Sequence, residues 1–154
     1  MKIVKWLVAL LVGVSLLIVA GVFIRNKVVR PAGWARDNTV NQLKPNMRDP
    51  GSMVVRSSYI ISVATPNKKN TTLTLCGVVD ARNDAGVYTG GLRFISTSVD
   101  DNDAGTFDTG PVLIEDPAQK VDAQRRHTLS AFESASWNTR CVDAAHPPLT
   151  PAAT

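Results

Sequence analysis

The chain has 154 residues, a formal net charge of +4 at pH 7 and 44% hydrophobic residues, which predicts one small domain plus an N-terminal segment. Residues 25–75 carry nine lysines and arginines against two aspartates, whereas residues 76–154 carry six against eleven acids. Because the acidic excess falls on the predicted sheet region, we do not expect a nucleic-acid-binding protein.

The N-terminal stretch from Trp6 to Ile24 has nineteen consecutive residues without a charge. As a helix it would cover about 28 Å, so the sequence predicts a transmembrane anchor at residues 1–25. A cleavable signal peptide is the alternative, since the start is basic and Val19-Ala20-Gly21 offers small residues. The apolar core of such a peptide is usually only about 7 to 15 residues long.

Residues 26–46 contain Pro31, Gly33 and Pro45 and few periodic apolar positions. They are therefore predicted to be a stalk with at most one short helical turn. Asp49-Pro50 then fits a helix N-cap followed by proline at the first helical position, which predicts a short helix near the start of a domain spanning residues 47–142.

The run from Cys76 to Phe94 is typical of two strands around a polar turn. Its centre, residues 80–86, holds Asn, Asp and Gly, which tolerate positive φ, and apolar, β-branched and aromatic residues lie on either side. The predicted strands are 59–64, 71–80, 87–95 and 111–115, with an acidic loop at 99–110. Together they predict an antiparallel sheet of about four strands.

This hairpin resembles a motif of small, mostly uncharacterised bacterial envelope proteins, many of them lipoproteins: Cys-Gly-x-Val-Asn-Ala-Lys-Asn, then Gly-x-Tyr-x-Gly and an aromatic. The matching positions are Cys76, Gly77, Val79, Ala81, Asn83, Gly86, Tyr88, Gly90 and Phe94, with Asp80 and Arg82 as near replacements. Asp49-Pro50-Gly51-Ser52 resembles the family's Asp-Pro-x-Ser start, and Trp137-Asn138-Thr139-Arg140-Cys141 resembles its closing Trp-Asn-x-x-Cys. The resemblance implies an exported, disulfide-linked α+β domain, and it implies no activity and no catalytic residue. No cysteine precedes Cys76, so the predicted helix would replace a lipid anchor.

Residues 118–141 lack Gly and Pro and are rich in helix-forming residues, which predicts one helix packed on the sheet. Its predicted buried side contains Val121, Leu129 and Phe132, and Trp137 and Cys141, four residues apart, share a face near its end. Residues 143–154 are rich in proline and are predicted to be a disordered tail. The predicted fold class is therefore α+β: an N-terminal transmembrane helix, a small antiparallel sheet of about four strands, a C-terminal helix packed on it, and one disulfide.

Cys76 and Cys141 are the only cysteines. In line with the resemblance, an oxidising compartment would join them, and this crosslink would contribute about 4 kcal/mol in the chain-entropy model. The alternative is two reduced core cysteines in the cytoplasm. No metal site or cofactor is predicted, because these cysteines with His127 and His146 show no zinc-ligand spacing.

Membrane orientation is predicted from two opposing arguments. The basic residues after Ile24 outnumber those before Trp6, which favours a cytoplasmic domain. The cysteine pair and the resemblance to exported proteins favour the other side. We predict a protein of the bacterial inner membrane whose domain faces the periplasm.

Two stretches carry residues suited to chemistry. Asp100–Gly105 superficially matches a calcium loop, but Ala104 and Pro111 fall where oxygen ligands belong, so a solvated acidic loop is expected. His127 and Ser130 lack an orienting acid and an oxyanion site in the sequence. Neither His127 nor His146 has an acid partner by spacing, so no catalytic residue is predicted.

Asn83, Tyr88 and Arg93 form the candidate binding surface, on the hairpin and just after it. The alternative is that Asn83 only bonds the turn and Tyr88 only packs in the core. The predicted function is a membrane-anchored periplasmic binding or interaction module, such as an inhibitor, an immunity-type protein or an accessory subunit, with a periplasmic protein or an envelope polymer as partner. A small envelope hydrolase is the alternative.

Overall fold

The structure is a computed structural model that describes residues 2–24, 30–67, 69–88 and 90–151. The chain divides into two compact units, residues 1–34 and residues 35–154. The first holds α1 (Lys2–Ile24) and the beginning of α2 (Arg30–Leu43). The second holds most of α2, the sheet and the C-terminal segment.

The predicted transmembrane helix is not confirmed. Across the described residues, no helix combines the length and the apolar character that a membrane span needs.

The predicted stalk contains a helix that belongs to the core. From Arg30 to Leu43 the chain forms α2, and one side of it, Ala35, Thr39 and Leu43, has no exposed surface. The Thr39 hydroxyl donates to the Ala35 carbonyl at 2.6 Å, so the polar side chain is satisfied within the helix. Pro31 lies in the first turn, where its missing N–H removes no helical hydrogen bond.

A short segment connects α2 to the sheet. It contains the 3₁₀ helices η2 (Lys44–Asn46) and η3 (Pro50–Ser52). The Asp49 carboxylate accepts from the Gly51 N–H at 3.1 Å, which confirms the predicted N-cap and its short helix.

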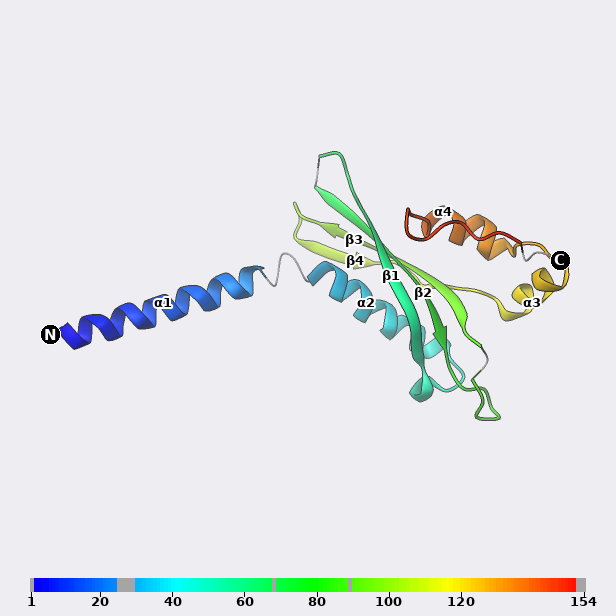
Figure 1. The fold of residues 1–154 in the computed structure, drawn as a ribbon, viewed down its shortest axis with the longest axis horizontal. Helices are drawn as coiled ribbons and strands as arrows, with labels where there is room; N and C mark the ends of the chain where they lie inside the picture. The colour runs from blue at the N-terminus through cyan, green and yellow to red at the C-terminus, as the bar shows by residue number, and fades with distance from the viewer. Residues whose placement is uncertain (1, 25–29, 68, 89, 152–154) are drawn as a thin grey trace. The chain divides into compact units, whose positions relative to one another are not determined.

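The sheet is antiparallel throughout, as predicted (Figure 1). Its strands are β1 (Val54–Ala64), β2 (Asn70–Asp80), β3 (Leu92–Asp101), β4 (Thr106–Thr109) and β5 (Leu113–Ile114). The order is β1-β2-β3-β4, with β5 also paired to β3. The predicted acidic loop at 99–110 is shorter than expected, because β3 and β4 take up both of its ends.

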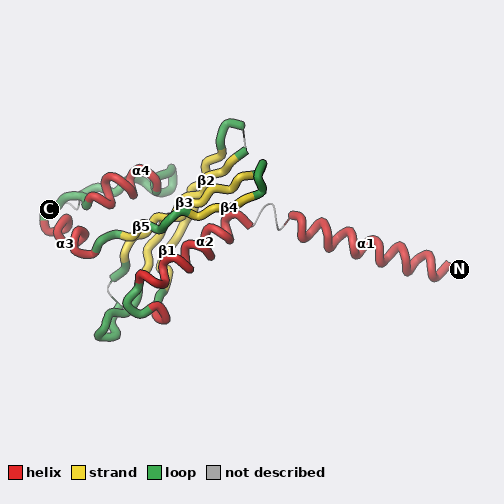
Figure 2. Tube along the Cα trace, turned by 180° about the vertical axis from the view of Figure 1, so that it is seen from behind, coloured by secondary structure: helices red, strands yellow, loops and turns green. Residues whose placement is uncertain are grey.

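Both faces of the sheet are covered, whereas the sequence predicted a single helix packed on it. Leu75 and Phe94 pack with Leu43 of α2, while their neighbours Cys76 and Ile95 pack with Trp137 from the C-terminal segment. Side chains alternate between faces along a strand, so these adjacent residues serve two separate cores. Figure 2 shows α2 and α4 on opposite sides of the strands.

A glycine is required where the motif has its Cys-Gly pair. Gly77 lies opposite Phe94 on β3, and a Cβ atom at Gly77 would come within 2.7 Å of the Phe94 ring and 2.5 Å of the Ser57 carbonyl oxygen. Only a residue without a side chain lets the aromatic ring lie this close to β2.

The predicted single C-terminal helix is interrupted. The chain forms α3 (Pro117–Arg125), the π-helix η4 (Phe132–Trp137) and α4 (Asn138–Arg140). His127 has a φ of 54°, which is incompatible with a continuous right-handed helix. Within α3, Ala123 is buried and the predicted core residue Val121 is 44% exposed.

The disulfide between Cys76 and Cys141 is present, with 5.8 Å between the Cα atoms, and this confirms the predicted pair. The chain beyond it differs from the predicted disordered tail over the residues described. Asn138 and Leu149 exchange two hydrogen bonds, at 2.9 and 2.8 Å, and Leu149 packs on the disulfide cluster.

Candidate functional site

The hairpin turn is built by one asparagine. The Asn83 side-chain oxygen accepts from the N–H groups of Ala85 and Val87, each at 3.0 Å, and Gly86 supplies the positive φ of 77° that closes the turn. The asparagine therefore has the turn-bonding role that the sequence left open. Its exposed side also lines a cleft at the base of the hairpin.

Tyr88 is held across the hairpin rather than in the core. Its hydroxyl donates to the Ser52 carbonyl at 3.1 Å. The guanidinium groups of Arg56 and Arg82 lie 4.8 and 5.5 Å from its ring centre. A cation–π contact at this distance holds an arginine side chain against the ring and leaves its positive charge in place.

Arg93 forms salt bridges in a partly buried network of charged side chains. Its Nη1 lies 3.0 Å from Glu115 Oε1 and 2.8 Å from Glu133 Oε1, and its backbone N–H donates to Glu115 at 3.2 Å. The Glu115 side chain is fully buried. The network joins β3, the chain after β5 and η4, which leaves Arg93 a structural role.

A cleft of about 570 Å³ lies where the hairpin meets α3 and the segment after η2; we call it the hairpin cleft. Its apolar surface includes Val79, Leu92 and the exposed Val121, and its polar rim includes Asn83 and Gln124. The predicted binding surface was Asn83, Tyr88 and Arg93. Among the described residues that line the hairpin cleft, Asn83 is the one that belongs to this set.

The acids of the hairpin cleft already have cationic partners. Asp80 is buried and lies 3.1 Å from Arg56. Glu115 pairs with Arg93 and lies 3.6 Å from the Lys120 ammonium. Lys120 also donates to the Gly91 carbonyl at 2.8 Å, so this cation is fixed in place.

Two cations of the hairpin cleft are not paired in this way. Arg48 and Arg82 both line it and both are exposed. Within the part of the chain that the structure describes, neither guanidinium forms a salt bridge with a carboxylate. The unpaired charge presented by the hairpin cleft is therefore positive, although the surrounding half of the chain is acidic.

Sequence reasoning missed both arginines as site residues. Arg48 precedes the Asp-Pro cap and Arg82 lies inside the hairpin motif, and tertiary structure alone brings them to one cleft. For Arg48, the excess of basic residues in 25–75 was the one feature of the sequence that could have indicated a site. For Arg82, the sequence does not show that its side chain lies against the Tyr88 ring.

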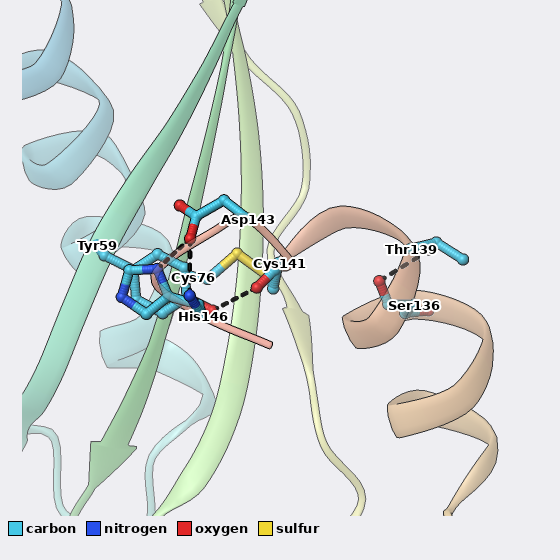
Figure 3. Close-up of a disulfide and its surroundings, with 7 residues drawn as sticks. All are labelled: Tyr59, Cys76, Ser136, Thr139, Cys141, Asp143 and His146. Carbon is cyan, nitrogen blue, oxygen red and sulfur yellow. Dashed lines mark hydrogen bonds and ion pairs between the residues drawn. A yellow bond between two sulfur atoms is a disulfide. The ribbon is translucent and has the colours of Figure 1, made fainter. Parts of the chain in front are cut away.

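A histidine–aspartate pair lies on the other face of the sheet (Figure 3). His146 Nδ1 is 2.8 Å from Asp143 Oδ1, and the imidazole stacks on Tyr59 with 3.6 Å between ring centres. The Tyr59 hydroxyl donates to the Cys141 carbonyl at 2.6 Å. The expectation that neither histidine has an acid partner is therefore wrong, because the tail folds back in a tight turn.

Two pKa values respond to this arrangement. Burial raises the pKa of Tyr59, and the negative charge of Asp143 raises it further. For Asp143 a desolvation effect raises the pKa, but hydrogen bonds from His146 and from the backbone of Ala145 and His146 outweigh it, so the pKa is lowered. The carboxylate is thus held ionised beside the imidazole.

The His146 pair has the form of a base with its orienting acid, but it lacks a nucleophile. Among the described residues, no serine, threonine or cysteine side chain hydrogen-bonds His146. In Figure 3 Ser136 and Thr139 lie on the helical segment away from the imidazole. The pair fastens the tail to β1 beside the disulfide.

The other stretches with candidate chemistry bond to their own backbone. The Ser130 hydroxyl accepts from the Glu133 N–H at 3.1 Å while Glu133 accepts from the Ser130 N–H at 2.8 Å, which is a capping box. Asp101 accepts from the N–H groups of Asp103 and Ala104. No cluster of three or more metal-binding side chains occurs in the described ranges.

Comparison with protein-family models, with curated proteins and with solved structures finds no match for this chain.

Proposed function

We propose that residues 35–154 form a binding module of the bacterial cell envelope, and that the hairpin cleft takes an acidic group of a partner protein or envelope polymer. One observation carries the proposal: Arg48 and Arg82 line the same cleft, and neither forms a salt bridge with a carboxylate among the described residues. Exposed guanidinium groups recognise carboxylates and phosphates through paired, charge-assisted hydrogen bonds.

The rest of the hairpin cleft suits a ligand with mixed character. Asn83 and Gln124 offer amide groups at the rim, and Val121 offers an exposed apolar surface. Specific sites combine apolar contact area with a few polar groups that fix orientation. The charge of Asp80 and Glu115 does not oppose an acidic ligand, because both are already paired.

The compartment is supported by the disulfide. Bonds of this kind persist in the periplasm and outside the cell and are rare in the cytosol. Together with the resemblance of the hairpin motif to exported proteins, the bond between Cys76 and Cys141 favours a periplasmic site of action. Such a module would act as an inhibitor, as an immunity-type protein or as an accessory subunit.

A small envelope hydrolase is supported by the pairing of His146 with Asp143. A general base needs a reacting group within hydrogen-bond reach, and the described chain supplies no hydroxyl or thiol there. The stacking of the imidazole on Tyr59 also covers one side of the ring. The binding module therefore agrees better with the geometry.

Calorimetric titration of the full chain tests the proposal, using an acidic peptide in which aspartate alternates with glycine. We expect binding, and we expect Arg48→Ala with Arg82→Ala to weaken it at least tenfold, since each charge-assisted hydrogen bond is worth about 1.5–3 kcal/mol. Arg140→Ala is the matched control, because Arg140 is exposed and does not line the hairpin cleft. Equal loss in both variants, or no binding by the unaltered chain, would reject the proposal.

A further inference from the structure

We propose that the outer edge of β1 is a dimer interface, at which two copies of this chain pair their β1 strands antiparallel to make one continuous sheet. This inference concerns a surface that the hairpin cleft does not use.

The β1 strand has a partner on one side only. It is the first strand of the order β1-β2-β3-β4 and pairs with β2. In the described structure, residues 54–63 form no backbone hydrogen bond outside that ladder. Half of the N–H and C=O groups of an edge strand point outward and can pair with another strand.

The opposite edge of the sheet is protected, and β1 is not. There β4 has four residues with an exposed Asp108, and Pro111 follows shortly after. Short strands, charges and prolines are the usual means of blocking edge pairing. β1 has eleven residues, and from Ser57 to Ala64 it contains no charge and no proline. Its bulge, between Val55 and Ser57, lies at the start of that run.

The occupant that these residues fit is a second copy. A two-fold axis at Ile60 places Ser58 opposite Ser62 of the other copy and Tyr59 opposite Ile61. The two residues of each such pair lie on the same face of the joined sheet. Like charges directly opposite would destabilise such a pair, and this run carries none. The contact also covers part of Val63, which is 61% exposed in one copy.

Sedimentation of the full chain over a range of concentrations tests the interface. We expect a dimer, and we expect Ser62→Lys to raise the dimer dissociation constant at least about tenfold, because the symmetry brings in two lysines at once. Thr106→Lys on β4 is the matched control, with the same charge change at the protected edge. It should leave the dissociation constant unchanged.

A second variant and a second measurement guard against misfolding. Ser58→Lys should weaken the dimer as Ser62→Lys does, with a melting temperature close to that of the unaltered chain. Hydrogen exchange of the β1 amides should be slow in the dimer and faster in both variants. A monomer at every concentration, or a dimer that both lysine variants leave intact, would overturn the inference.

Discussion

The face of the sheet under α2 is held by packing and side-chain hydrogen bonds, whereas the face under the C-terminal segment also has a covalent link. On the α2 side, Leu43 packs on Leu75 and Phe94, and Gln42 accepts from the Val112 N–H at 3.0 Å. On the other side the disulfide ties Cys141 to β2.

The difference follows from what each segment can bury. α2 is a regular helix with a continuous buried side, so packing holds it. The C-terminal segment is broken at His127. Its cluster has two large buried apolar residues, Trp137 and Ile95, and three further side chains are only partly buried against it: Tyr59, Phe132 and Leu149. A broken segment with a small core needs a crosslink and tail contacts to stay on the sheet.

Removing the disulfide should have the largest effect. Replacing Cys76 and Cys141 by alanine should lower the free energy of unfolding by about 4 kcal/mol, because the crosslink closes a long loop. Hydrogen exchange should rise first in residues 117–150, while α2 amides keep their protection. Equal loss of protection on both faces would contradict the distinction between them.

Leu43→Ala should destabilise the other face by about 3 kcal/mol, since Leu43 has no exposed surface and its removal leaves a cavity. Denaturant unfolding measures the change. Asn41→Ala, on the exposed side of the same helix, should change stability little. If both variants behaved alike, α2 would be a stalk and not part of the core.

Gly77→Ala should cost about 1–3 kcal/mol, because the new methyl group meets the Ser57 carbonyl oxygen and the Phe94 ring. The carbonyl belongs to β1, so relief requires moving the strand. Gly33→Ala has open space around it within α2 and should instead stabilise the helix by up to about 1 kcal/mol. A neutral Gly77→Ala in thermal unfolding would show that the ring can move away.

The smallest effect is expected at Asp143. Its lowered pKa means that the ionised form stabilises the folded chain; that contribution is complete above the ordinary value of 3.8 and is lost as pH falls through the folded-state pKa. Asp143→Asn should therefore flatten the stability curve on the acid side of pH 3.8. Denaturant unfolding at several pH values measures this curve.

Local chemistry was enough to predict the hairpin turn and the antiparallel pairing, but the strand predicted at 87–95 is displaced along the chain, since β3 runs from Leu92 to Asp101. Asn83 and Gly86 define the turn through their own bonds and φ, and the strands on either side carry strand-forming residues. The Asp49 cap was predicted for the same reason. These features depend on residues close together in the chain.

Other features depend on residues far apart and left no readable pattern. The buried side of α2 includes Ala35 and Thr39, which are too small or too polar to show as an apolar stripe. His127 has a positive φ although it is not a glycine, so the sequence did not indicate that the helix is interrupted there. Arg48 and Arg82 line one cleft only because the fold brings the hairpin connection close to the segment following α2.

The most direct test of the account is a map of acidic-peptide binding by nuclear magnetic resonance on the isotope-labelled full chain. If the hairpin cleft is the binding site, amide shifts should concentrate at Arg82, Asn83 and Gln124 and should disappear in Arg48→Ala with Arg82→Ala. Shifts concentrated instead around Tyr59 and His146, or unchanged by the double variant, would contradict it.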